Sequence, residues 1–105
     1  MFISATAPTI ANGFGLGSTV NAPNGVVAFR LNIGGGGTAN SGPIGLPNAA
    51  NGWNCTAQDI TTTANAWQTK QTANTHTSVT FTNYNMGIPT PWQSNDTLAI
   101  NCLAY

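Results

Sequence analysis

The sequence predicts an all-β fold, a small β-sandwich or barrel with an extended N-terminal arm. Several runs alternate apolar and polar residues with period two, as half-buried strands do. Turn residues separate these runs at a spacing of about 8–15 residues, which is typical of sandwiches and barrels. Charged residues make up only 4% of the chain and Glu is absent, so exposed helices lack their usual residues. A length of 105 residues allows one domain.

Residues 1–25 are rich in Ala, Gly, Asn, Thr and Pro. Pro8 and Pro23 cannot donate to a strand ladder, which restricts this segment to edges and turns. We expect an arm or a set of short edge strands that contributes little to the core. The sandwich domain is then expected over residues 26–105.

Residues 26–33 form the clearest strand pattern of the chain. The turn signal Asn24-Gly25 precedes it. Alternation predicts an apolar face made by Val27, Phe29, Leu31 and Ile33. The opposite face is mixed, and it includes Arg30.

Four consecutive glycines begin the segment from Gly34 to Asn51. Glycine-rich turns bind phosphate when a helix follows them, but this segment contains Pro43, Pro47 and no helical period. We therefore predict a long Gly/Pro-rich loop over 34–51 rather than a phosphate site. A loop of this length in a small domain usually has a function, such as contact with a neighbouring subunit.

Four further strands are predicted in the second half, at 52–60, 66–71, 78–84 and from 97 to the C-terminus. Their inward-facing residues are expected to be Trp53, Cys55, Ala57, Val79, Phe81, Leu98, Ile100 and Cys102. The outward residues of the third of these strands are Ser78, Thr80 and Thr82. The four strands complete the predicted sandwich.

Cys55 and Cys102 are the only cysteines of the chain. With His76 as the only histidine, they cannot complete a four-ligand zinc site. The N-terminus has no signal-peptide pattern, so we expect synthesis in the cytoplasm without secretion. In that reducing environment we expect two buried thiols, although the geometry would allow a disulfide.

Catalysis requires titratable groups that converge on one site, and this chain has few. A Cys–His pair could act as nucleophile and base, but His76 lies in a polar stretch typical of a hairpin tip. Asp59 and Asp96 could form an acid–base pair as in glycosidases. The simpler prediction is that Asp59 ends a strand and that Asp96 accepts N–H bonds in a turn. We therefore predict no enzyme, no catalytic residue, no metal and no cofactor.

Aromatic residues allow two interpretations, a sugar-stacking platform or anchors of the core and of subunit interfaces. The residues concerned are Trp53, Trp67, Trp92, Tyr84 and Tyr105. Trp53 is expected inside, because it shares a face with Cys55. Trp92 follows Pro89-Thr90-Pro91 and is expected in a peripheral loop.

The formal net charge is zero, with two basic and two acidic side chains. No basic patch indicates nucleic acid, and no apolar run approaches the roughly 20 residues of a membrane span. A monomer with so little charge has little repulsion to keep it soluble. The composition therefore favours a protein that functions within an assembly.

Residues 50–105 carry a recognisable pattern of strand faces and turns. It consists of Gly52-Trp53-Asn54-Cys55, Asp59-Ile60-Thr61, Gln71-Thr72, Ser78-Val79-Thr80-Phe81-Thr82-Asn83-Tyr84, Trp92, Ser94-Asn95-Asp96, Leu98, Ile100, Cys102 and Tyr105. This pattern resembles a β-sandwich module in virion proteins of tailed bacteriophages, found in small capsid-associated proteins and in fibre tips. The resemblance implies a jelly-roll-like sandwich in a virion, often as a symmetric oligomer, and no catalytic residue.

The resemblance leaves two functions open. The first function is that of a capsid decoration or cement protein. Such a protein would bind the major capsid protein as a homo-oligomer, most simply a trimer. We expect this one, because a chain of 105 residues that starts at Met1 suggests a whole gene product. A receptor-binding module of a tail or head fibre, which binds glycans or a host surface, is the alternative.

Overall fold

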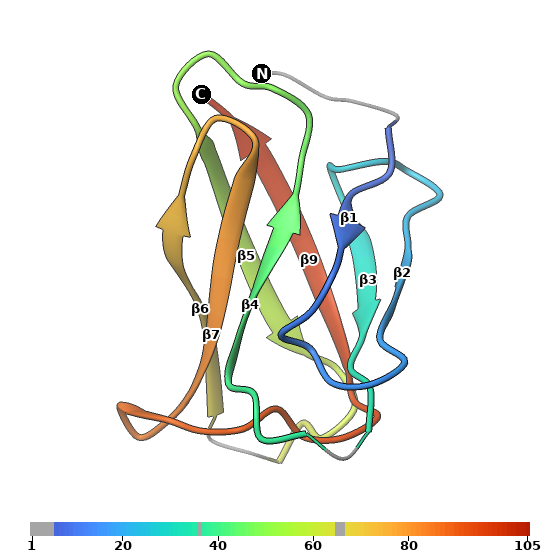
Figure 1. The fold of residues 1–105 in the computed structure, drawn as a ribbon, viewed down its shortest axis with the longest axis vertical. Helices are drawn as coiled ribbons and strands as arrows, with labels where there is room; N and C mark the ends of the chain where they lie inside the picture. Colours follow the sequence, from blue (N-terminus) through green and yellow to red (C-terminus); the bar gives the residue numbers. More distant parts are fainter. Residues whose placement is uncertain (1–5, 36, 65–66) are drawn as a thin grey trace.

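The fold is all-β, as predicted, and consists of two antiparallel sheets (Figure 1). A computed structural model describes residues 6–35, 37–64 and 67–105. No helix occurs among these residues. The strands are β1 (Thr9–Ile10), β2 (Thr19–Asn21), β3 (Phe29–Asn32), β4 (Ser41–Gly45), β5 (Trp53–Asp59), β6 (Trp67–Asn74), β7 (Ser78–Asn85), β8 (Ile88–Pro89) and β9 (Thr97–Ala104).

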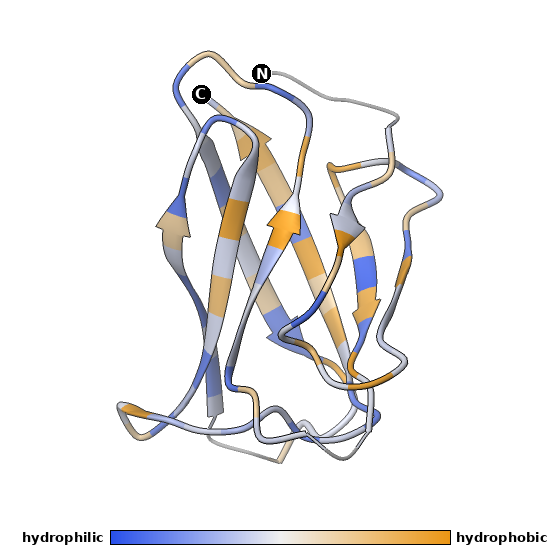
Figure 2. Ribbon diagram, in the orientation of Figure 1, coloured by the Kyte–Doolittle hydropathy of each residue, from blue (hydrophilic) through white to orange (hydrophobic). Residues whose placement is uncertain are grey.

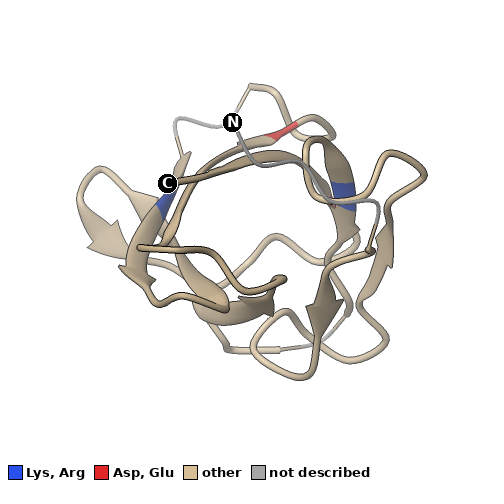
Figure 3. Ribbon diagram, turned by 90° about the horizontal axis from the view of Figure 1, so that it is seen from above, with Lys and Arg blue, Asp and Glu red and all other residues tan. Residues whose placement is uncertain are grey.

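The two sheets are named here after their central strands. The β7 sheet has the order β1-β4-β7-β6, and β8 also pairs with β7. The β9 sheet has the order β2-β3-β9-β5. At the sides of the sandwich β1 contacts β2 and β5 contacts β6, so the sheets surround one interior (Figure 3).

Side-chain alternation explains the core, and Figure 2 shows it as apolar bands along the strands. Buried residues from both sheets meet in a single cluster. The predicted inward residues Phe29, Leu31, Trp53, Cys55, Val79, Phe81, Leu98, Ile100 and Cys102 are all buried, and Ala57 is half-buried and packs against them. The predicted faces of these strands are therefore confirmed.

One part of the predicted face is wrong at the start of β3. Val26 is fully buried, whereas Val27 is only half-buried. Gly25 has a positive φ of 68°, residues 23–26 form a turn and residues 27–28 a bend, so regular alternation begins only at Phe29. The predicted strand therefore begins three residues too early.

The N-terminal segment contributes more to the core than expected, although residues 1–5 lie outside the described residues. It provides the edge strands β1 and β2, and between them the side chain of Phe14 is fully buried. Phe14 packs against Trp92 with ring centroids 5.3 Å apart. Its ring also lies over Gly42, where an added Cβ would come within 2.6 Å of it. Glycine is therefore required at position 42.

The prediction of a loop over 34–51 is wrong in its middle, because residues 41–45 form β4. This strand pairs with β7 over its full length and with β1 at its end. The backbones of Asn40 and Leu46 form hydrogen bonds with β7. Because successive residues of a strand direct their backbone groups to opposite sides, the nitrogen of Pro43 points away from β7. Pro43 is exposed and lies beyond the last residue pair with β1, where no N–H is needed.

Thr82, predicted to face outward on β7, is nevertheless buried. Its hydroxyl lies 2.9 Å from that of Thr72 on β6 and 3.3 Å from that of Ser41 on β4. A ladder of short hydroxyl side chains thus covers this part of the outer face. The predicted strand at 66–71 is found as β6, with Ala66 outside the described residues.

Side-chain amides join the two sheets where β5 faces β6. Gln71 accepts a hydrogen bond from the backbone N–H of Cys55 (2.7 Å) and donates one to the carbonyl of Trp53 (2.8 Å). Asn74 accepts the N–H of Trp53 (2.8 Å) and donates to the hydroxyl of Tyr105 (2.7 Å). The free edge of β5 is thereby satisfied at Trp53 and Cys55 without a further strand.

Cys55 and Cys102 form a disulfide, which corrects the expectation of two reduced thiols. They lie directly opposite each other on β5 and β9, with their Cα atoms 4.1 Å apart. The backbone N–H of Cys55 bonds to Gln71 rather than to β9. This agrees with a non-hydrogen-bonded pair, the position where antiparallel strands bring side chains closest.

Replacing Gln71 by Ala should lower the free energy of unfolding by about 1–3 kcal/mol, because two backbone groups beside the buried Trp53 lose their partners. The control is Gln68→Ala, which removes an exposed amide of the same strand and should change stability by less than about 0.5 kcal/mol. Urea denaturation of both variants measures the difference. Equal effects would show that the amide bridge contributes nothing.

Reducing the disulfide should lower the free energy of unfolding by about 4 kcal/mol in the chain-entropy model, since it joins residues 47 apart. Urea denaturation with and without a reductant measures this. The control is the double variant Cys55→Ala/Cys102→Ala, whose stability should not respond to the reductant. Two free thiols in the natively folded, non-reduced protein would contradict the assignment.

Candidate functional site

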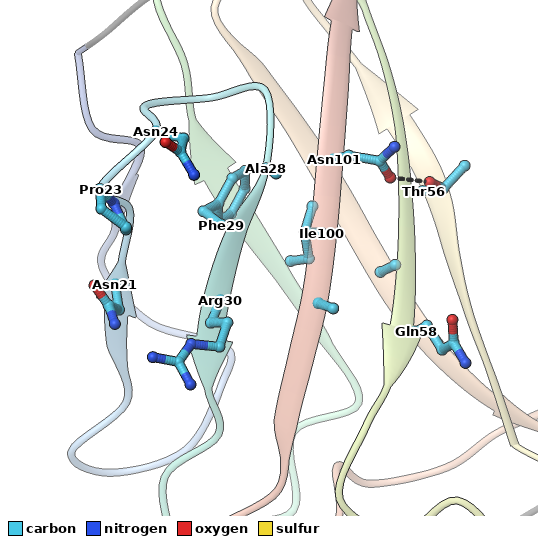
Figure 4. Close-up of a pocket in the computed structure, with 12 residues that line it drawn as sticks. Asn21, Pro23, Asn24, Ala28, Phe29, Arg30, Thr56, Gln58, Ile100 and Asn101 are labelled. Atoms are coloured by element: carbon cyan, nitrogen blue, oxygen red, sulfur yellow. Dashed lines mark hydrogen bonds between the residues drawn. The ribbon is translucent and has the colours of Figure 1, made fainter.

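A groove lined by both polar and apolar residues lies on the outer face of the β9 sheet (Figure 4). Its volume is about 570 Å³, which is within the usual range for ligand sites. All four strands of the sheet and the turn before β3 contribute to it. The lining residues are Asn21, Pro23, Asn24, Ala28, Phe29, Arg30, Thr56, Ala57, Gln58, Ala99, Ile100 and Asn101.

The register of the strands explains the shape of the groove. Ala99 on β9 lies between Arg30 on β3 and Gln58 on β5, and Asn21 on β2 follows Arg30 outward. The small side chain of the central strand lowers the floor, while the longer side chains of the neighbouring strands form the walls. A sheet face that would otherwise be flat is therefore hollowed along β9.

Arg30 provides the only formal charge among the residues that line the groove. Its guanidinium makes no hydrogen bond or ion pair with any described residue, and the side chain is exposed. No acidic residue lines the groove. The site therefore has a positive potential from one guanidinium whose donors are all available.

The other polar groups of the groove are neutral. Thr56 donates its hydroxyl to the amide oxygen of Asn101, as the dashed line in Figure 4 shows. This bond leaves the amide nitrogen of Asn101 free to donate to a ligand. The side chain of Gln58 makes no hydrogen bond with a described residue, so its amide can both donate and accept.

A second hollow of about 330 Å³ continues from the groove around the edge of β5. Both hollows share Ala57 and Gln58. The second one is lined in addition by Trp67 and Lys70 of β6 and by Asp59 at the end of β5. Trp67 is half-buried, so part of its ring system is accessible there.

The Cys–His pair considered from the sequence does not form a nucleophile. Cys55 and Cys102 are bonded to each other, and a disulfide sulfur is not a thiolate. His76 lies at the exposed tip of the β6–β7 hairpin, as expected, with its Nδ1 atom 3.1 Å from the carbonyl oxygen of Ala49. These residues serve packing and loop contacts.

Asp59 and Asp96, the only acidic residues of the chain, lie together. Asp59 accepts the backbone N–H groups of Thr61 (2.9 Å) and Thr62 (3.0 Å). Asp96 is buried, and its Oδ2 atom has no hydrogen-bond partner among the described residues. Burial raises the pKa of Asp96, and the adjoining Asp59 carboxyl raises it further, while hydrogen bonds from Thr62 oppose the shift. The neutral, protonated form of Asp96 is therefore favoured in the folded chain.

The aromatic residues do not form a common platform. Trp53 is fully buried as expected, and its Nε1 donates to the carbonyls of Pro47 and His76. Trp92, expected to be peripheral, is instead buried, and its Nε1 donates to the carbonyl of Gly13 at 2.6 Å. Tyr105 is 57% exposed at the C-terminal end of the sandwich. Among the five, Trp67 is the one that lines a hollow beside the groove.

The glycine segment does not form a phosphate cradle in its described part. The N–H of Gly34 bonds to the carbonyl of Phe14 (2.8 Å) and that of Gly35 to the carbonyl of Leu16 (3.0 Å). Within the described ranges there is no cluster of three or more His, Cys, Asp or Glu residues that could hold a metal ion. Nor does any helix there have the length and apolarity to span a membrane.

The groove is not predicted by the sequence pattern, although Arg30 lies on the predicted mixed face of its strand. The signal was a set of small and amide residues at the outward positions of strands that are far apart in sequence. Their grouping depends on the order β2-β3-β9-β5, which alternation does not give.

The free energy of unfolding should fall as pH rises above about 4, because folded Asp96 holds its proton more tightly than the unfolded chain does. Asp96→Asn should abolish this slope and be at least as stable as the native protein at pH 7. Few other groups titrate in the acid range, so denaturant titrations at several pH values isolate the effect. A stability that rises with pH in both proteins would contradict the raised pKa of Asp96.

Comparison with known proteins gives no relative from which a function could be transferred. No protein-family model, no curated protein and no solved structure matches the chain. Its function must therefore be inferred from its own surfaces.

Proposed function

We propose that this chain is a non-catalytic structural protein of a virion, which decorates and stabilises the head of a tailed bacteriophage. The phage-like pattern over residues 50–105 supports the proposal. The nearly uncharged surface does so as well, because a closely packed protein assembly requires few charges to be desolvated (Figure 3).

The observation that carries this proposal is the apolar tip of the β7–β8 hairpin. Met86 is 87% exposed and Ile88 is 67% exposed, on a turn that projects from one end of the molecule (Figure 2). Met86 (φ 51°) and Gly87 (φ 83°) are the central residues of the turn, as in a type I′ turn. For Met this conformation costs about 1–2 kcal/mol. A strained tip that displays two apolar side chains is well suited to dock into a pocket of a neighbouring subunit.

A decoration protein of this kind would stabilise the shell by binding assembled capsid subunits and not free ones. We propose the major capsid protein as its partner and a homotrimer as its bound form. Symmetric copies would present three such hairpins to the shell. Native mass spectrometry tests the trimer directly.

A receptor-binding module of a fibre is the second candidate function. The groove on the β9 sheet favours it, because a preformed polar hollow with unengaged donors is not needed for attachment to a shell. The two candidates place the chain on different parts of the particle.

The double variant Met86→Ser/Ile88→Ser should bind heads that lack this protein at least tenfold more weakly than the native chain, as expected for loss of a docking hot spot. Co-sedimentation with purified heads measures the affinity. The matched control is Leu16→Ser, which removes an 88% exposed apolar side chain from the loop between β1 and β2. It should bind as the native chain does.

Undiminished binding of the double variant would exclude the hairpin as the docking element. Immunogold labelling of intact particles provides the test of location. Labels confined to the tail or to fibres would overturn the decoration proposal in favour of the receptor-binding one.

A further inference from the structure

We propose that the groove on the β9 sheet binds oligosaccharides that carry a carboxylate, with Arg30 as the anchor of the acidic sugar. The proposal rests on the second candidate function and names its ligand class. Head decoration does not depend on it, because the docking hairpin is a separate element.

The guanidinium of Arg30 is available to bind a carboxylate. An Arg on a protein surface commonly pairs with an acid, but Arg30 has no partner among the described residues and no acid lines its groove. Its planar fork of donors matches the two oxygens of a carboxylate. The other basic residue, Lys70, lies on β6 in the other sheet (Figure 3). A single bidentate anchor therefore defines one end of the ligand.

Hydroxyl groups are the second feature that the groove matches. The amides of Asn21, Asn24 and Gln58 make no hydrogen bonds with described residues, and Asn101 retains a free amide nitrogen. An amide both donates and accepts, as a sugar hydroxyl does. Figure 4 shows these side chains around the hollow, on both sides of β9. The hydroxyl groups of the sugar can thus replace water at several points without leaving a buried polar group unpaired.

The dimensions of the groove suit a short oligosaccharide. Arg30 and Gln58 lie on strands that flank β9, so two strand spacings, about 10 Å, separate their backbones. The floor between them is Ala99, which lets a sugar ring lie close to the sheet. Beyond Gln58 the second hollow presents Trp67, a surface on which a further ring can stack.

Other ligand classes fit less well. A peptide that adds as a strand needs a free sheet edge, whereas the groove lies on a sheet face whose backbone groups are paired between strands. A nucleic acid needs several cations along its phosphates, and the groove has one. An acidic side chain of a protein partner could engage Arg30 but would leave the amides unused.

The test uses 3′-sialyllactose and tri-galacturonic acid as acidic probes, and lactose as the neutral one. Two-dimensional ¹H–¹⁵N spectra of the native protein follow the backbone and the Asn, Gln and Arg side chains. We expect shifts concentrated at Arg30, Gln58 and Asn101 with at least one acidic probe, and at least tenfold weaker binding of lactose. Absence of shifts with both acidic probes at millimolar concentration would overturn the proposal.

Arg30→Gln should weaken binding of the acidic probe about 10- to 100-fold, as expected for loss of a charged hydrogen-bonded pair. The matched control is the double variant Arg30→Gln/Thr77→Lys, which restores the net charge at the β6–β7 hairpin tip, outside both hollows, and should bind as weakly as Arg30→Gln. The side chains of Arg30 and Thr77 are exposed, so both variants should fold. Recovery of the affinity in the double variant would indicate general attraction of anions and contradict the site.

A glutamate-containing peptide is the remaining probe. If it binds the groove as tightly as the acidic sugars, the ligand class is wrong and Arg30 serves a protein contact. Failure of the sugar proposal is distinguishable from failure of the second candidate function. Native particles that adhere to host cells through this chain, without sugar binding in the groove, would support receptor binding by another surface.

Discussion

The amide bridge between β6 and β5 is the interaction on which the closed form of this sandwich depends. β5 is an edge strand whose unpaired backbone groups lie beside the buried Trp53, where they would be costly without partners. Gln71 supplies both an acceptor and a donor, so one side chain acts as a short piece of strand. Asn74 extends the bridge and ties in the C-terminal Tyr105. The two sheets are thus joined on this side by side chains, while the disulfide to Cys102 fixes β5 on its other side.

Scarcity of charge shapes the rest of the molecule. Because almost no ion pairs are available, hydroxyl and amide groups provide the polar contacts, as the Thr72–Thr82 pair on the β7 sheet shows. The two carboxyls of the chain are placed together, and burial beside Asp59 raises the pKa of Asp96. The two basic side chains lie on different sheets. Each basic side chain therefore has few other charges near it.

The two candidate surfaces are separate from one another. The hairpin tip with Met86 and Ile88 belongs to the β7 sheet and is apolar, whereas the groove with Arg30 belongs to the β9 sheet and carries amide groups and one guanidinium. A protein that docks through one and binds a ligand through the other needs no moving part between them. The rigid, disulfide-linked core holds both surfaces in a fixed relation, which suits a structural component that also displays a binding face.

The sequence by itself determined the fold class and most of the core, because period-two alternation is a local property of each strand and fixes which residues face inward. It did not reveal β4, since the small residues and Pro43 of that strand carry no apolar period. Nor did it place Phe14 or Trp92, whose burial comes from contact between segments 78 residues apart. The tertiary structure alone decided three features: the disulfide, the proximity of Asp59 to Asp96, and the groove on the β9 sheet. Each depends on which strands become neighbours, and strand order is set by packing across the whole domain rather than by any local pattern.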